Sequence, residues 1–238
     1  MGKNFIVDTH AHTNMSRHAH STLEQYLQQA KKMGIPAFSI TEHGPATGDG
    51  ATSEKISKFL DLPPVLDGIR VFKGSELNIM NYDGELDISD DIISKMDIVL
   101  AGVHHTHKPA RYADAAINAI CSGKIDILTH PDNPHFPMMD NIDRITSAAA
   151  SHGVAIEINE HSFDFYRGFG INVERVLVSA LKNGAYISLG SDSHHHSALA
   201  NYYHVFPLLD KYKVPKTRVV NSSLAYFESF LNKRRENR

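Results

Sequence analysis

A short apolar segment followed by a loop and a helix-type pattern recurs about seven times along the 238 residues, and this repetition restricts the fold most. Segments that are apolar on both faces and alternate with helices are typical of a parallel sheet covered by helices. The predicted strands cover residues 5–7, 37–40, 69–72, 98–103, 125–129, 154–158 and 185–189. The sequence therefore predicts an α/β fold.

Helical spacing of apolar residues predicts the connecting helices. They cover residues 23–33, 53–62, 89–96, 112–121, 140–152, 173–182, 202–212 and 223–232. Turn residues at 81–84 separate two short extended pieces, which predicts a small hairpin. A sheet in which a helix follows each strand most often closes into a barrel, although periodicity alone leaves an open doubly wound sheet as the alternative. We expect one domain over residues 1–238.

Composition narrows the class of protein. The formal net charge is −3, without the basic surface that nucleic-acid binding requires, so nucleic acid is an improbable partner. No apolar run approaches the roughly 20 residues of a membrane span, and the N-terminus lacks a secretion signal, which predicts a cytoplasmic protein. Cys121 is the single cysteine and lies in an apolar helix pattern, so we expect it in the core. A homo-oligomer is compatible with the sequence.

Side chains that can bind metal follow every predicted strand. His10 and His12 are two residues apart, so in an extended segment both point to one side and can chelate one ion. His18 lies farther along the same loop, at a reach that suits a second ion. The complete set is His10, His12, His18, His43, Glu76, His104, His130, Asp192 and His194. Because barrel enzymes build their sites at the C-terminal ends of strands, closure would bring this set together.

Six motifs, in this order, resemble the PHP (polymerase and histidinol phosphatase) domain family, most closely its small single-domain bacterial phosphatases. They read Asp-Thr-His-Ala-His-Thr (8–13), Thr-Glu-His-Gly (41–44), Gly-Ser-Glu (74–76), Gly-Val-His (102–104), Thr-His-Pro (129–131) and Gly-Ser-Asp-Ser-His (190–194). Each motif alone is weak, but the ordered set spans almost the whole chain. The resemblance implies a distorted seven-stranded (β/α)7 TIM-like barrel, the PHP fold.

The resemblance also implies three zinc ions, with manganese or iron as competing metals because histidine and carboxylate ligands discriminate poorly among them. The implied ligand groups are His10, His12, Glu76 and Asp192; His18, His43 and His194; and Glu76, His104 and His130. Glu76 would bridge two ions, and we expect Glu76 and Asp192 to be the catalytic carboxylates. The protein would then supply fewer bonds than three four-coordinate ions need, and such open positions mark catalytic zinc.

Charge predicts the substrate class. Three divalent cations, two carboxylates and neutral histidines leave about four net positive charges, which suit a phosphate dianion. We therefore expect a phosphatase that hydrolyses small phosphomonoesters by attack of a metal-activated water on phosphorus. Arg167 could clamp a phosphate oxygen, and Asn159 and His161 could orient the substrate. Asp8 is expected to orient a ligand histidine.

Other functions use the same ligands. A phosphodiesterase or nuclease, a phosphotyrosine phosphatase and a non-catalytic regulatory metal-binding module are the alternatives. A metal-dependent amide hydrolase is less favoured because the motifs lack the metal-bridging lysine usual in that class. The physiological substrate and the group that protonates the leaving oxygen cannot be read from these motifs.

Overall fold

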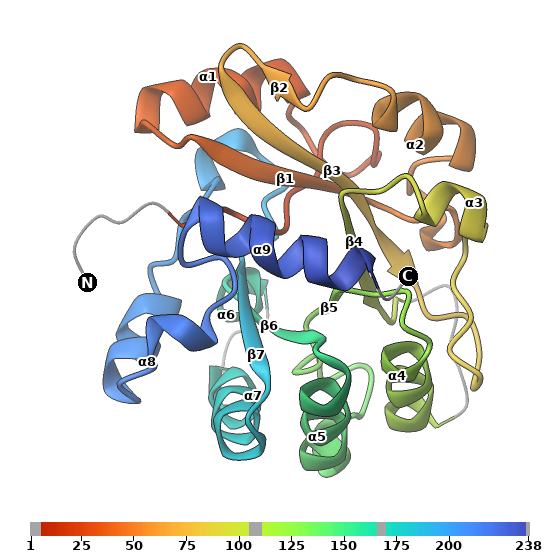
Figure 1. Cartoon of the computed structure of the whole chain (residues 1–238), viewed down its shortest axis with the longest axis vertical. Coiled ribbons are helices and arrows are strands. Elements are labelled where there is room, and N and C mark those ends of the chain that lie inside the picture. The colour runs from red at the N-terminus through yellow and green to blue at the C-terminus, as the bar shows by residue number, and fades with distance from the viewer. Residues whose placement is uncertain (1–5, 105–110, 166–169, 237–238) are drawn as a thin grey trace.

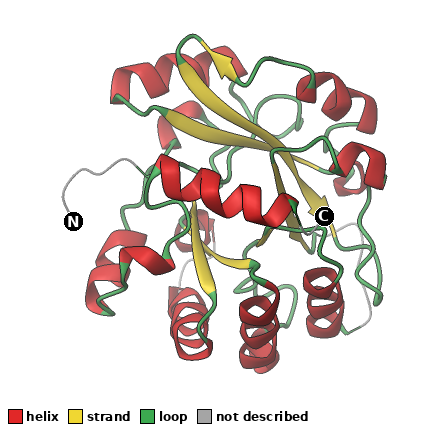
Figure 2. Ribbon diagram, viewed as in Figure 1, coloured by secondary structure: helices red, strands yellow, loops and turns green. Residues whose placement is uncertain are grey.

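The computed structural model describes residues 6–104, 111–165 and 170–236, and six of the predicted strands form one parallel sheet in chain order. These strands are β1 (Ala37–His43), β3 (Ile69–Asn78), β4 (Ile98–Gly102), β5 (Ile127–Leu128), β6 (Ala155–Asn159) and β7 (Tyr186–Gly190). The short β2 (Val65–Leu66) pairs antiparallel with the start of β3. The curled sheet lies at the centre of the molecule, with the helices outside it (Figure 2). The predicted α/β class is confirmed.

The predicted closed seven-stranded ladder is wrong, because the sheet is open between β1 and β7. Among the described residues, the first predicted strand at 5–7 does not form. The segment 8–12 lies between the two ends of the sheet instead. It makes single parallel bridges, from Asp8 to Phe38 of β1 and from Ala11 to Ser193 after β7.

The hydrogen bonds explain why this segment is not a strand. The N–H groups of Ser39 and Thr41, two residues apart on β1, donate to the carbonyls of Asp8 and Ala11, which are three residues apart. The N-terminal segment therefore carries one extra residue, as in a β-bulge, and such an excess interrupts a ladder and re-aims side chains.

Most predicted helices form close to their predicted bounds. They are α1 (Leu23–Met33), α2 (Ser53–Leu60), α3 (Asp90–Ile93), α4 (Tyr112–Cys121), α5 (Ile142–His152), α7 (Gly170–Asn183), α8 (Val205–Lys211) and α9 (Leu224–Arg235). A short α6 (His161–Phe165) was not predicted. The predicted helix at 89–96 shortens to α3, because Lys95 and Met96 bond three residues back in tighter turns. The hairpin forms as a single antiparallel bridge between Ile79 and Leu86.

Two apolar layers position the site. Helices α4, α5 and α7 lie side by side and cover the outer face of β4 to β7 (Figure 1). Inside the curl, Phe72 and Leu100 pack against Phe227 of α9, which crosses the N-terminal ends of the strands. At the end of α9, Arg234 donates to the carbonyls of Gly123, Ile125 and His152. Helix α9 thus covers this end of the sheet, and the C-terminal ends of the strands stay available for a site.

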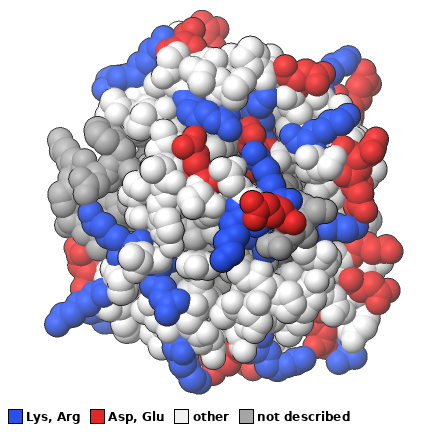
Figure 3. Space-filling view, in the orientation of Figure 1, with Lys and Arg blue, Asp and Glu red and all other residues white. Residues whose placement is uncertain are grey.

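The surface corrects one prediction. Cys121 is exposed, because the buried face of α4 is formed by Ala116, Ala119 and Ile120 and the cysteine lies off that face. On the face that carries α9, acidic and basic side chains are interspersed (Figure 3). None of the helices in the described ranges combines the length and apolar character of a membrane span.

Candidate metal centre

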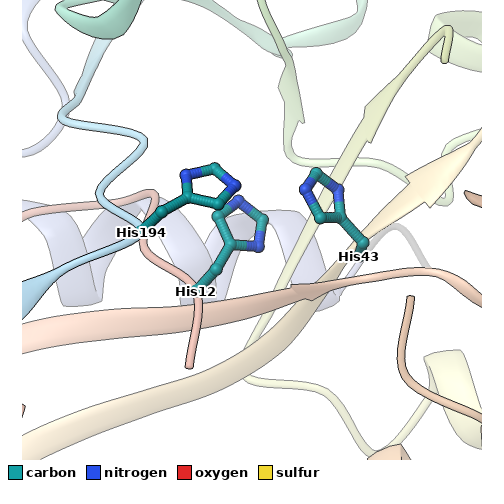
Figure 4. A group of neighbouring side chains, drawn as sticks. All are labelled: His12, His43 and His194. Atoms are coloured by element: carbon teal, nitrogen blue, oxygen red, sulfur yellow. The ribbon is translucent and has the colours of Figure 1, made fainter. Parts of the chain in front are cut away.

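The structure brings the nine predicted metal ligands together at the C-terminal ends of the strands. His43 is the last residue of β1 and lies in register with Glu76 on β3. Every member of the set has a side-chain nitrogen or oxygen within 3.3 Å of another member. Figure 4 shows the imidazoles of His12, His43 and His194 facing one another from three separate segments. Sequence-distant loops thus converge on one point.

Glu76 is the centre of this set and is fully buried. Its Oε1 lies 2.7 Å from Nε2 of His130 and 3.2 Å from Nε2 of His104. Its Oε2 lies 2.8 Å from Nδ1 of His43 and 3.3 Å from Nε2 of His10. Burial alone would raise the pKa of Glu76, but these imidazoles hold it well below its ordinary value. Glu76 is therefore an anion, with both oxygens directed at nitrogen ligands.

Asp192 is the second carboxylate. Its Oδ1 lies 3.2 Å from Nε2 of His12 and 3.5 Å from Nε2 of His10. Burial opposes ionisation, yet the nearby histidines hold the pKa of Asp192 well below its ordinary value. Asp192 and His130 have positive φ angles of 52° and 27°. Such strained backbone persists where the surrounding structure enforces it, and it clusters at functional sites.

The hydrogen bonds of His18 and His194 indicate which ring nitrogen of each histidine is protonated. Nδ1 of His18 lies 2.7 Å from a carboxylate oxygen of Asp49, and Nδ1 of His194 lies 2.9 Å from the carbonyl of Asp192. These oxygens only accept hydrogen bonds, so in the neutral imidazoles each Nδ1 carries the proton and each Nε2 presents a lone pair. The two Nε2 atoms lie 2.8 Å apart. Two lone pairs at this distance repel each other unless a cation lies between them.

The same pattern holds for His10 and His104. Nδ1 of His10 donates to Glu157 at 2.7 Å, and Nδ1 of His104 donates to Asn78 Oδ1 at 2.7 Å. Their Nε2 atoms, together with one oxygen each of Glu76 and Asp192, are buried without a hydrogen-bond partner. Burial lowers the pKa of His43 to about 4, which keeps it in the neutral, metal-binding form. Buried nitrogen and oxygen atoms that lack a hydrogen-bond partner fit the coordination of divalent cations.

The donors group in space around three points. Within each group, the ligand atoms lie within 4.8 Å of one another. The groups are His10, His12 and Asp192; His12, His43 and His194; and His43, Glu76 and His104. The first group agrees with the division of ligands that the family resemblance implies. The second contains His12 in place of His18, and the third contains His43 in place of His130. The number of ions and the division of the ligands stay predictions.

A cavity of about 480 Å³ opens beside these groups. Its lining combines six predicted ligands with Thr47, Asp49, Asn133, Phe136, His161 and Ser162. Other cavities of about 540 and 750 Å³ lie against α9 and between α5 and α7, away from the ligand set. The cavity at the histidines is of a size that suits a small molecule.

Residues 8–165 match the family model described as the PHP domain. The chain belongs to the PHP domain family. It is 40% identical over 235 residues to a protein of Shewanella oneidensis named "Probable phosphatase", and a Shewanella piezotolerans protein of that name is equally similar. These alignments cover 97% of this chain and 92% and 94% of the two relatives.

Two solved structures share the fold. The first is the histidinol phosphate phosphatase of Lactococcus lactis, complexed with zinc, L-histidinol and phosphate, at a TM-score of 0.54 and 17% identity. That match covers 96% of this chain and 93% of the other. The second is a chain in archaeal ribonuclease P with mature tRNA, at a TM-score of 0.61, 14% identity and coverage of 95% and 90%. At these identities the likeness shows the PHP fold alone.

The residues that hold the candidate ligands in place were missed in the sequence. Glu157 holds His10, and Asn78 holds His104 and is itself bonded to Asp87. Glu157 carried a signal, since a carboxylate within the apolar strand at 154–158 must have buried donors. No such signal marked Asn78 and Asp87, because His104, which they hold, lies far away in the sequence.

The predicted substrate contacts differ in their placement. Arg167 lies outside the described residues. His161 lines the cavity, with its ring 5.8 Å from that of His194. The buried amide of Asn159 bonds to Glu157, Asp192 and the N–H of Ser162, so its predicted contact with substrate stays a prediction.

The prediction for Asp8 needs correction. Its carboxylate accepts hydrogen bonds from Ser191, Ala200 and Tyr202 and from the backbone N–H of His10, whereas the His10 ring is held by Glu157. Asp8 therefore fixes the backbone of two ligand loops rather than an imidazole.

Glu42 orders the loop that connects His12 to His18 in the PHP site. One carboxylate oxygen accepts from the N–H and hydroxyl of Thr13, at 2.8 and 2.6 Å. The other accepts from the N–H and hydroxyl of Ser16, at 3.2 and 2.7 Å. All three residues are buried. The loop conformation thus depends on a single carboxylate.

We expect Glu42→Ala to lower the free energy of unfolding by about 2–4 kcal/mol, because the buried N–H of Thr13 and the buried hydroxyls of Thr13 and Ser16 lose their acceptor. Urea unfolding measures the change. Glu54→Ala is the control, since the Glu54 side chain is 77% exposed and forms a surface ion pair with Lys58. A loss no larger than that of the control would contradict this role of Glu42.

Proposed function

We propose that this PHP protein is a metal-dependent phosphatase that hydrolyses phosphomonoesters of small molecules at a site for three divalent cations, zinc being the first candidate. The observation that carries the proposal is the convergence of inward-facing histidine lone pairs on Glu76 and Asp192. Imidazole nitrogens and carboxylate oxygens at such spacing suit zinc, manganese or iron. Names of relatives at 40% identity point to the same chemistry.

The ligands we propose are His10, His12, His18, His43, Glu76, His104, His130, Asp192 and His194. When bound, divalent cations acidify water and neutralise negative charge on phosphate oxygens. Glu76 contacts four histidines, so its carboxylate fixes their relative positions. Asp192 does the same for His10 and His12. Both carboxylates thereby set the geometry in which a phosphate is held.

The charge of the site favours a dianion. The carboxylates of Glu157 and Asp49, which accept from His10 and His18, add two negative charges to those of Glu76 and Asp192, so three divalent cations leave about two net positive charges. A phosphomonoester carries more negative charge than a diester and gains more from this field. His161, Asn133 and Ser162 on the cavity wall offer hydrogen bonds to the rest of a small substrate. Arg167 is the proposed clamp for a phosphate oxygen.

The test is hydrolysis of p-nitrophenyl phosphate, with metal content determined on the same sample by mass spectrometry. We expect about three ions per chain, and we expect activity to disappear with a chelator and return with zinc, manganese or iron. A fully metal-loaded protein that is inert towards a broad panel of phosphomonoesters would refute the proposal. Cleavage of bis-p-nitrophenyl phosphate in preference would indicate a phosphodiesterase.

A further inference from the structure

We propose that Glu157 is a positioning residue that joins two of the three metal sites, so that its loss weakens those two and spares the third. This inference rests on the proposed function for the existence of the metal sites. It goes further by assigning a role to a side chain outside the ligand set. It also predicts which ions depend on that side chain.

Both carboxylate oxygens of Glu157 are committed to ligand residues. Glu157 is fully buried on β6. Its Oε1 accepts from Nδ1 of His10 at 2.7 Å. Its Oε2 accepts from the backbone N–H of His130 at 3.0 Å. In the proposed division, His10 and His130 bind different ions, and one carboxylate therefore positions a ligand of each.

Asn159 extends this connection. Its Nδ2 donates to Oε2 of Glu157 at 3.1 Å and to Oδ2 of Asp192 at 3.2 Å. Asp192 and His10 are proposed ligands of the same ion, so this ion depends on Glu157 through two routes. The backbone strain at His130 and Asp192 falls on the two residues whose positions this network fixes.

The neighbouring strand leaves the carboxylate little room to move. A Cβ atom placed on Gly190 of β7 would overlap Oε1 of Glu157 and crowd the Cβ of His10. Only a glycine lets the backbone come this close. The carboxylate is therefore held between β7 and the ligand loops, which makes it a rigid support.

The third proposed site has a different support. Nδ1 of His18 donates to Asp49, whose side chain is 42% exposed. Among the hydrogen bonds of the described residues, none connects Glu157 to His18, His43 or His194. Asp49 and Glu157 are thus carboxylates with the same chemistry towards a histidine Nδ1, and they serve different ions. They form a matched pair for an experiment.

Glutamine at position 157 would disturb the network while keeping its shape. Glu157 is the acceptor in its hydrogen bonds with His10, His130 and Asn159. An amide offers one acceptor oxygen and places an NH₂ group against at least one N–H donor. Loss of such a partner typically weakens metal binding about 10–100-fold.

The experiment compares Glu157→Gln with Asp49→Asn by titrating each metal-free protein with zinc against a chromophoric chelator. Wild type is expected to bind about three ions. In Glu157→Gln we expect two of them to bind about 10–100-fold more weakly, and in Asp49→Asn only one. Asn159→Ala, which removes the connection between Glu157 and Asp192 but leaves the bonds of Glu157 to His10 and His130 in place, is expected to weaken one ion. This third variant decides the matter if Glu157→Gln does not fold.

The outcomes separate the two proposals. If wild type binds no stoichiometric metal, the proposed function fails and Glu157 has no sites to join. If wild type binds three ions and Glu157→Gln binds them with unchanged affinity, the inference about Glu157 is overturned while the function stands. Equal weakening of all three ions in both variants would also overturn it, because that pattern reports general loss of structure.

Discussion

Replacing Glu76 with glutamine is expected to lower kcat for p-nitrophenyl phosphate by about a thousandfold or more, because bound cations contribute several kcal/mol to transition-state stabilisation. Glu76 contacts His10, His43, His104 and His130, so its charge balances more of the site than any other side chain. Glutamine keeps the shape but removes that charge. We expect metal content to fall together with kcat, measured on the same preparation.

Two comparisons make the Glu76 result specific. Asp192→Asn removes the other carboxylate and is expected to cost activity as well, with loss confined to the ion that His10 and His12 bind. Glu54→Gln changes an exposed glutamate on α2 and is expected to leave both metal content and kcat unchanged. Full metal content and full turnover in Glu76→Gln would exclude Glu76 as a bridging ligand. Thermal unfolding of the metal-free proteins checks that the fold persists.

The repeated strand and helix pattern was sufficient to predict the parallel order of β1 and β3 to β7, because each buried strand is too apolar to lie on a surface. It was insufficient at the N-terminus. Residues 5–7 have the composition of a strand, but the extra residue between Asp8 and Ala11 breaks the ladder. A bulge depends on which carbonyl meets which N–H across the sheet. Local sequence does not contain that information.

In the candidate site, too, one part was predictable from the sequence and another was not. The convergence of the candidate ligands was predictable because most of them follow strands, and the ends of parallel strands meet in space. Glu157, Asn78 and Glu42 were not, since each acts through partners distant in sequence: Glu157 lies 147 positions from His10. Glu42 belongs to the Thr-Glu-His-Gly motif at 41–44, but the motif did not indicate a role for it. The groups that orient ligands are therefore a property of the tertiary structure.

Arg234 illustrates how the opposite end of the sheet supports the site without touching it. Its guanidinium is buried and donates to three carbonyls that precede β5 and β6. Its Nε also lies 3.6 Å from the buried Asp126. Arg234 is the middle residue of the Lys-Arg-Arg run at 233–235 in the last turn of α9, and it lies inside the fold.

We expect Arg234→Met to lower the free energy of unfolding by about 3–5 kcal/mol, because it leaves a buried carboxylate and several carbonyls without their cation. Urea unfolding of the metal-free protein measures this loss. Arg235→Met is the matched control, since Arg235 is 40% exposed and its pairing with Asp97 is worth at most about 1 kcal/mol. Equal losses in the two variants would contradict a special role for Arg234. Because α9 and the ligand set occupy opposite ends of the strands, the Arg234 variant should keep its metal stoichiometry wherever it remains folded.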